Sequence, residues 1–148
     1  MNTTTLVYGS PTALVDIPDY LSIMDSLREH LVVFADLPVP AYLCVSGYAS
    51  GDDTHISVQL HGGRLIDTVG DLVEWSDTLV DCVVSVWRPD NDESAHVAVI
   101  GTLTDGRARV RVWAGVDGTL GMEPHQRRTF GSEQLHVWGG GSPMDVTP

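Results

Sequence analysis

Lysine is absent from this chain of 148 residues, and all eight basic residues are arginines. Acidic residues number 20, so the formal net charge is −12. A surface that binds nucleic acid needs clustered positive charge to neutralise phosphates. The composition therefore argues against direct nucleic-acid binding. It leaves open the opposite role, an acidic decoy that imitates DNA toward a basic partner, although the acidic residues form no long run.

Cysteine is scarce as well, since Cys44 and Cys82 are the only two and neither belongs to a C-x-x-C pair. Both lie in apolar, strand-like contexts, which favours buried free thiols in a reducing compartment; a bridge between the two stays open. Long apolar runs are missing too, so we expect neither a secretory signal peptide nor a membrane-spanning helix. These absences predict a cytoplasmic bacterial protein that does not contact a membrane.

Two stretches have the apolar spacing of amphipathic helices, 16–34 and 64–79. Asp16 is suited to cap the first helix, and Pro18 is tolerated in its first turn. Its apolar residues recur every three to four positions, which predicts one stripe on the core side. The residues of that stripe are Leu21, Met24, Leu27, Leu31 and Phe34.

Alternating apolar residues predict five strands. They cover 41–48, 55–62, 81–89, 94–103 and 107–116. The resulting order, α-β-β-α-β-β-β, predicts an α+β fold of two layers, with two helices packed on one face of an antiparallel sheet of about five strands. We assign residues 1–118 to this single domain. Residues 119–148 are rich in Gly and Pro and are expected to form an extension that packs on the domain or on a neighbouring chain, with 134–138 as a short strand.

The two helix–hairpin segments match when the chain is shifted by 41 residues. Six positions are identical, among them His55 with His96 and Val58 with Val99. Two units of equal length share apolar spacing by chance, so both explanations stay open: a duplicated α-β-β unit, or independent units of the same pattern.

Strand alternation assigns the side chains to two faces. The first face is uniformly aliphatic and should pack under the helices: Leu43, Val45, Ile56, Val58, Leu60, Val84, Val86, Val97, Val99, Val110 and Val112. The second face mixes aromatic and basic residues, which interface centres prefer. We take its candidate interaction residues to be Tyr48, His55, Trp87, His96, Arg109, Arg111 and Trp113. A protein interface, a cover formed by the C-terminal extension and a ligand groove are the three alternatives for this face.

No catalytic or metal-binding pattern stands out. His55 and His61 lie six residues apart on one strand, about 20 Å, too far to share one metal ion. Asp81 precedes Cys82 and should raise the pKa of its thiol, which opposes nucleophilic use. No phosphate-binding glycine loop is present. We therefore predict no catalytic residues, no metal and no cofactor.

The segment 70–116 resembles a pattern in small uncharacterised actinobacterial proteins. The matching residues are Trp75, Asp77, Thr78, Leu79, His96, Val97, Val99, Gly101, Leu103, Asp105, Gly106, Val110, Val112 and Trp113. The resemblance implies a taxon and an α+β fold, and it implies no activity.

The sequence thus favours a non-enzymatic interaction or regulatory module over an enzyme. We expect it to act as a homodimer or other homo-oligomer, through its second sheet face or its extension, and to bind a further protein partner that the sequence does not identify. Two alternatives remain: the acidic DNA-mimicking inhibitor, and a small-molecule binder or enzyme that uses His, Trp and Arg on that face.

Overall fold

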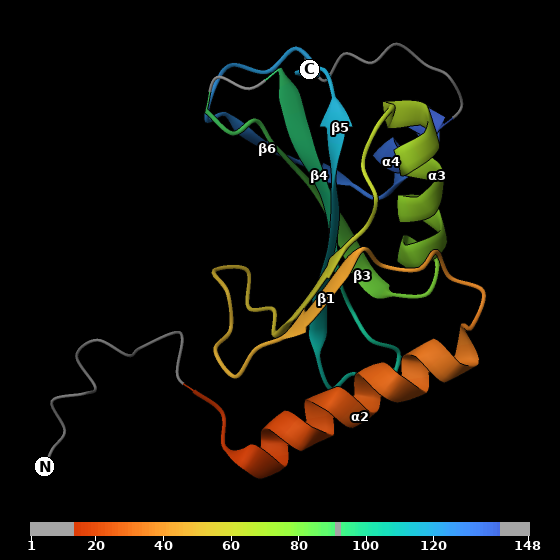
Figure 1. Cartoon of the computed structure of the whole chain (residues 1–148), viewed down its shortest axis with the longest axis vertical. Coiled ribbons are helices and arrows are strands. Elements are labelled where there is room, and N and C mark those ends of the chain that lie inside the picture. Colours follow the sequence, from red (N-terminus) through yellow and green to blue (C-terminus); the bar gives the residue numbers. More distant parts are fainter. Residues whose placement is uncertain (1–13, 91–92, 140–148) are drawn as a thin grey trace, which may run out of the picture.

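The computed structural model describes residues 14–90 and 93–139. In this part of the chain an α+β fold is present, with three helices and a sheet of six strands (Figure 1). The elements are α2 (Ile17–Val33), β1 (Tyr42–Val45), β2 (Ile56–Gln59), α3 (Leu65–Ser76), β3 (Val80–Trp87), β4 (Ser94–Thr102), β5 (Arg109–Asp117), β6 (Arg127–Gly131) and α4 (Glu133–Gly139). The prediction of about five strands was one strand short, because β6 was not anticipated.

The sheet has the order β1-β2-β5-β4-β3-β6. Four of the neighbouring pairs are antiparallel, and β2 with β5 is parallel. The expected purely antiparallel sheet is therefore wrong at this one pair. A parallel neighbour needs a crossover, and here the crossover contains α3, β3 and β4.

The aliphatic face predicted from alternation is buried in the central strands. Ile56, Val58, Val84 and Val86 have no exposed surface, and the β4 and β5 valines are likewise fully buried. The exceptions are on β1, where Leu43 has 40% of its surface exposed and Val45 is half-buried. This is an edge strand with a neighbour on one side only, so less of the domain covers it.

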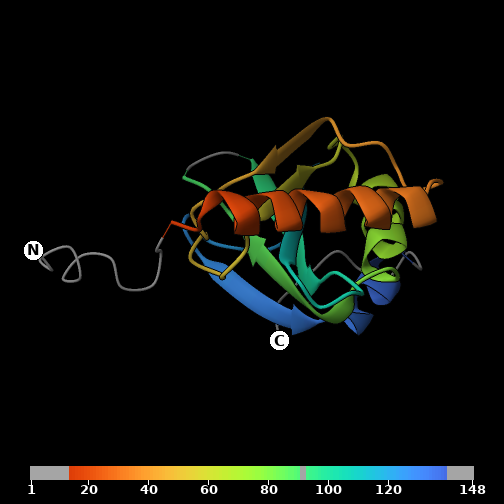
Figure 2. The same cartoon turned by 90° about the horizontal axis from the view of Figure 1, so that it is seen from below.

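Two helices form the layer over this face, but they are not the two that the sequence predicted. Helix α3 packs on β4 and β5 through Val69, Leu72 and Trp75, and α4 packs beside α3. Helix α2 instead crosses one end of the sheet (Figures 1 and 2). The indole nitrogen of the buried Trp75 donates to the backbone oxygen of Pro38, which ties the segment between α2 and β1 to α3.

Helix α2 is rotated relative to the prediction. Asp16 caps it as expected, accepting a hydrogen bond from the backbone N–H of Asp19. Its core side, however, consists of Ile23, Leu27 and His30 together with Ser26. These residues also have helical spacing, but the polar His30 hid the stripe from the sequence pattern. The Nε2 atom of His30 lies 2.9 Å from the Thr78 hydroxyl, so a polar residue is accommodated in the core. Of the predicted stripe, Leu27 is buried, whereas Leu21 and Met24 are exposed.

The described part of the predicted extension belongs to the same sheet and helix layer. Strand β6 pairs with β3, and α4 follows it directly. The predicted strand at 134–138 was wrong, because Leu135 and Trp138 are buried one helical turn apart while Val137 is exposed. The Trp138 ring contacts Phe130 of β6 edge to face at 5.6 Å. The boundary proposed at residue 118 thus falls between two strands of one sheet.

One glycine permits the crossing from β2 toward α3. A Cβ atom on Gly62 would lie 2.1 Å from the backbone oxygen of Gly115 on β5, so no larger residue fits there. The next residue, Gly63, donates to that same oxygen and continues along β5. The glycines at this point therefore extend the contact between the β1–β2 hairpin and the centre of the sheet.

The two hairpins share one register. Val45 pairs with Ile56 in the first hairpin, and Val86 pairs with Val97 in the second, each shifted by 41 residues. The hairpins flank β5 and run in opposite directions relative to it, as a twofold axis through β5 would place them. A duplicated unit would show this agreement. The duplication itself stays a prediction, since α2 and α3 pack differently and β1 and β2 are shorter than β3 and β4.

Candidate functional site

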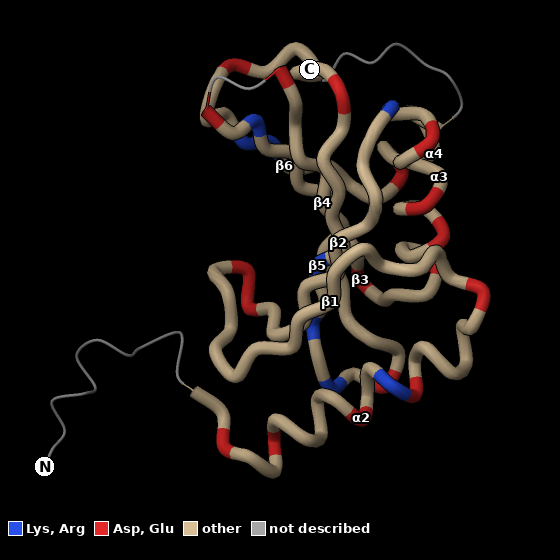
Figure 3. Tube along the Cα trace, viewed as in Figure 1, with Lys and Arg blue, Asp and Glu red and all other residues tan. Residues whose placement is uncertain are grey.

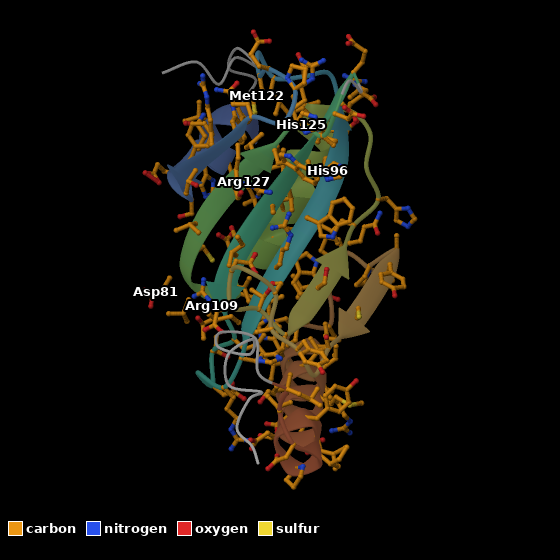
Figure 4. All side chains as sticks on the ribbon, turned by 90° about the vertical axis from the view of Figure 1, so that its left-hand side faces the viewer. Asp81, His96, Arg109, Met122, His125 and Arg127 are labelled. Carbon is orange, nitrogen blue, oxygen red and sulfur yellow. The ribbon has the colours of Figure 1, made fainter. Side chains whose placement is uncertain are left out.

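The sheet face opposite α3 and α4 is not covered by any described segment (Figures 1 and 4). Figure 4 looks onto this open face and shows His96, Arg109 and Arg127 on it. The face contains a hollow of about 530 Å³, with the loop between β1 and β2 along one wall. Its lining residues are Ser50, Gly51, Asp52, Val83, Ser85, Trp87, Ile100, Arg111, Arg127 and Thr129.

Three aromatic side chains lie together beside the hollow. The His96 ring lies between two tryptophans, edge to face with Trp87 at 5.3 Å and tilted against Trp113 at 4.7 Å. Each of the three is half-buried. Strand register explains the cluster, since Trp87 is directly opposite His96, and His96 is directly opposite Gly115, which leaves room for its ring. Each tryptophan is therefore partly covered by the His96 ring within one chain.

Arg111 is held by an ion pair across the hollow. Its guanidinium lies 3.3 Å from the carboxylate of Asp52, and both side chains are mostly buried. Burial alone would raise the pKa of the Asp52 carboxyl. Hydrogen bonds from Ser50 and Thr54, together with Arg111, outweigh that effect and leave the pKa lowered. The carboxylate is thus charged at neutral pH, and it neutralises this arginine.

Arg127 is held differently. Its guanidinium carbon lies 5.3 Å from the centre of the Trp87 ring, and it donates to the Ser85 hydroxyl at 3.3 Å. Within residues 14–90 and 93–139, no carboxylate lies within ion-pair distance of it. Strand β6 is the outer strand of the sheet, so this cation stands at the edge of the hollow on a rigid element. An arginine that is stacked on a tryptophan and lacks a counter-charge is ready to bind an anion.

The other predicted interaction residues lie away from the hollow. The Nδ1 atom of His55 lies 2.9 Å from the Ser46 backbone oxygen, where it closes the β1–β2 loop. Tyr48 is exposed in that loop, beyond the end of β1. Arg109 makes a long contact of 3.5 Å to the Thr102 hydroxyl. His55 and His96 lie beside positions of β5 that are some six residues apart. At the usual rise per residue this is about 20 Å, so the two histidines form no pair.

The thiols and acidic groups offer no second reactive centre in the described part of the chain. Burial raises the pKa of the Cys82 thiol, and Asp81 raises it further, as the sequence predicted. Cys82 also contacts Gly101, whose lack of a side chain makes room for the sulfur. No group of three His, Cys, Asp or Glu side chains within residues 14–90 and 93–139 is placed to hold a metal ion.

Sequence reasoning missed Arg127 and Thr129 because it did not anticipate β6. The segment 127–131 has a single apolar residue, Phe130, so it lacks the alternation by which a strand is found. The segment does contain a weak strand signal. Its residues alternate between two sides, with Arg127, Thr129 and Gly131 on one and Arg128 and Phe130 on the other, and of these only Phe130 needs an apolar neighbour.

Comparisons of this chain with protein-family models, with curated proteins and with solved structures gave no match. Among residues 14–90 and 93–139, no helix combines the length and apolarity needed to cross a membrane. The functional argument therefore depends on the geometry and chemistry of the open face.

Proposed function

We propose that the chain is a non-enzymatic binding module whose open sheet face binds an extended acidic segment of another protein beside β6. Arg127 carries this proposal, because it is the cation on this face that is fixed on an aromatic ring and has no carboxylate partner in the described part of the chain. In a chain of net charge −12, such a fixed cation selects an anionic group from among possible partners.

The edge position of β6 supports a polypeptide partner. Among the described strands, none lies beside the backbone groups on its outer side, so an extended segment could add to the sheet there. Side chains alternate along a strand, and those on one side of the added segment would point toward Arg127 and Thr129. An acidic side chain at that position would form a charge-assisted hydrogen bond with the guanidinium.

Synthetic eight-residue peptides test this proposal in matched pairs that differ only in Glu against Gln. Fluorescence polarisation should show preferential binding of the Glu peptides, weakening with salt. Arg127→Ala should lower their affinity about 10- to 150-fold, the equivalent of a hydrogen bond to a charged group of about 1.5–3 kcal/mol. Arg64→Ala is the matched control, since Arg64 is exposed on α3 away from this face. Equal binding of Glu and Gln peptides, or an unaffected Arg127→Ala variant, would contradict the proposal.

A small anionic molecule is a second candidate, favoured by the size of the hollow. About 530 Å³ falls inside the roughly 300–1,000 Å³ typical of small-molecule pockets. It predicts that a small aromatic carboxylate competes with the peptide and quenches tryptophan fluorescence in the wild type but not in Trp87→Phe.

The acidic decoy has less support. Figure 3 shows acidic positions spread over α2, α3 and the loops, where a DNA mimic would need them along one continuous stripe. Self-association stays a prediction, and the surface that favours it lies elsewhere on the molecule.

A further inference from the structure

Helix α2 presents an aliphatic stripe to solvent over most of its length, interrupted by Arg28 between Met24 and Val32. Ile17 is 70% exposed, Leu21 52%, Met24 42% and Val32 65%. These residues follow the helical repeat on the side away from Ile23, Leu27 and His30, which face the core. Burial of such side chains is the main favourable contribution to folding and association, so a stripe of this length is a candidate for contact with another surface.

A groove continues this stripe onto the sheet. It has a volume of about 390 Å³ between α2 and β1. Its lining residues are Met24, Leu27, Arg28, Leu31, Val32, Leu43 and Val45. The lining contains no carboxylate. Beside it, β1 is the outer strand of the sheet and exposes Tyr42 and Leu43.

We infer that this α2–β1 surface binds a second copy of the chain across a twofold axis, with the two α2 helices antiparallel. The groove lining carries no carboxylate, so two molecules of charge −12 repel each other less across it than across the acidic parts of their surfaces. An isologous contact also needs a surface that complements itself, and an aliphatic stripe meets that need.

Two charged residues of α2 are complementary under the same symmetry. Asp25 lies at the midpoint of the helix, and Arg28 lies three residues further on and lines the groove. An antiparallel copy centred at the level of Ser26 and Leu27 would place its Asp25 level with Arg28 along the helix axis, whereas the two Asp25 residues would lie about 4.5 Å apart along it, at about 1.5 Å per residue. The dimer would then hold two Arg28–Asp25 pairs, each joining one copy to the other.

Sedimentation of the full-length chain from about 1 to 200 µM tests the inference, because a dimer of micromolar affinity forms within this range. The wild type should approach twice 16.0 kDa. Leu21→Glu/Met24→Glu should remain at 16.0 kDa. Val137→Glu, a matched control exposed on α4, should behave as wild type, and so should Trp87→Ala/Arg111→Ala on the open face.

Charge reversal gives a test that does not depend on loss of apolar surface. Arg28→Asp and Asp25→Arg should each weaken the dimer, and the double variant Asp25→Arg/Arg28→Asp should restore it. A wild type that stays monomeric at the highest concentration would overturn the inference. So would a chain lacking residues 1–13 that dimerises when the full-length chain does not, since the N-terminal segment would then be the occupant. Peptide binding to the open face is measured separately and is unaffected by either outcome.

Discussion

The open sheet face and the outer side of α2 both expose side chains that folded proteins usually cover. The two regions differ in the contacts that these side chains make within the chain. On the open face, Trp87 and Trp113 each contact His96, and Arg111 is paired with the Asp52 carboxylate. On α2, the aliphatic stripe has no such internal partner in the described part of the chain. Aromatic and charged groups can be satisfied by directional contacts inside one chain. Aliphatic groups gain only by leaving water, so covering them requires another surface.

The largest expected effect comes from Trp138→Ala, which should remove the support of β6 at the open face and leave α2 unchanged. Trp138 is fully buried and supports Phe130 on the inner side of β6, the strand that carries Arg127. Truncating a buried tryptophan costs about 3–5 kcal/mol. Chemical denaturation should show that loss, whereas Val137→Ala on the same helix should cost less than about 0.5 kcal/mol. A loss of similar size in both variants would mean that α4 is not packed as the structure has it.

A second pair of variants separates the two sides of α2. Leu27 is buried and Leu21 is exposed. Leu27→Ala should therefore lower the free energy of unfolding by about 2–5 kcal/mol. Leu21→Ala should change it by less than about 0.5 kcal/mol in dilute protein, where a dimer does not form. Equal losses would show that the helix presents a different side to the core, and the contrast drawn with the open face would fail.

The smallest effect concerns His30, on the inner side of α2. The Thr78 hydroxyl donates to the Trp75 backbone oxygen, so it accepts from His30 Nε2–H, and the buried Nδ1 has no partner. Burial lowers the pKa of His30, although Asp105 across from α2 acts against this. Below about pH 6.5 the unfolded chain takes up a proton that the folded chain does not. The free energy of unfolding should therefore fall as the pH is lowered, by at most about 1.4 kcal/mol per pH unit.

Replacement of His30 should remove that dependence. Unfolding measured between about pH 7.5 and 5.5 should show a smaller slope for His30→Gln than for the wild type, since the range spans the ordinary histidine pKa. His136→Gln, at an exposed position of α4, should keep the wild-type slope. If the His30 variant loses stability with pH as steeply as the wild type, another group is responsible.

The same contrast explains how much could be predicted from the sequence. The buried sheet face was predictable, because alternation in β2 to β5 matches the pleat and both neighbours of each strand are present. The predicted burial of Leu43 was wrong, because alternation does not indicate whether a strand is at the edge of a sheet. The predicted core side of α2 was wrong, because His30 was counted as a polar surface residue. Its burial depends on Thr78, which is 48 positions away in the sequence.

The hollow was only partly predictable for a related reason. Trp87 and Arg111 were placed on the open face from alternation, and both line it. Arg127 was not predicted, because it lies on a strand whose only apolar residue is Phe130. Phe130 packs against Trp138, which belongs to a helix that the sequence pattern had predicted as a strand. Asp52 lies in a loop, and its pairing with Arg111, 59 positions further along the chain, depends on the fold of the segment between them.

The parallel pair of β2 and β5 has a consequence for the order of folding. Strands β3, β4 and β5 follow one another in the chain and pair with their neighbours, so short loop closures are enough to form them. The β1–β2 hairpin joins the sheet only through β5, where Ser57 meets Arg111 across 54 positions (111 − 57). We expect it to dock after the meander has formed and to open first. That hairpin carries one wall of the hollow and one side of the α2 groove, so both proposed binding surfaces depend on its docking.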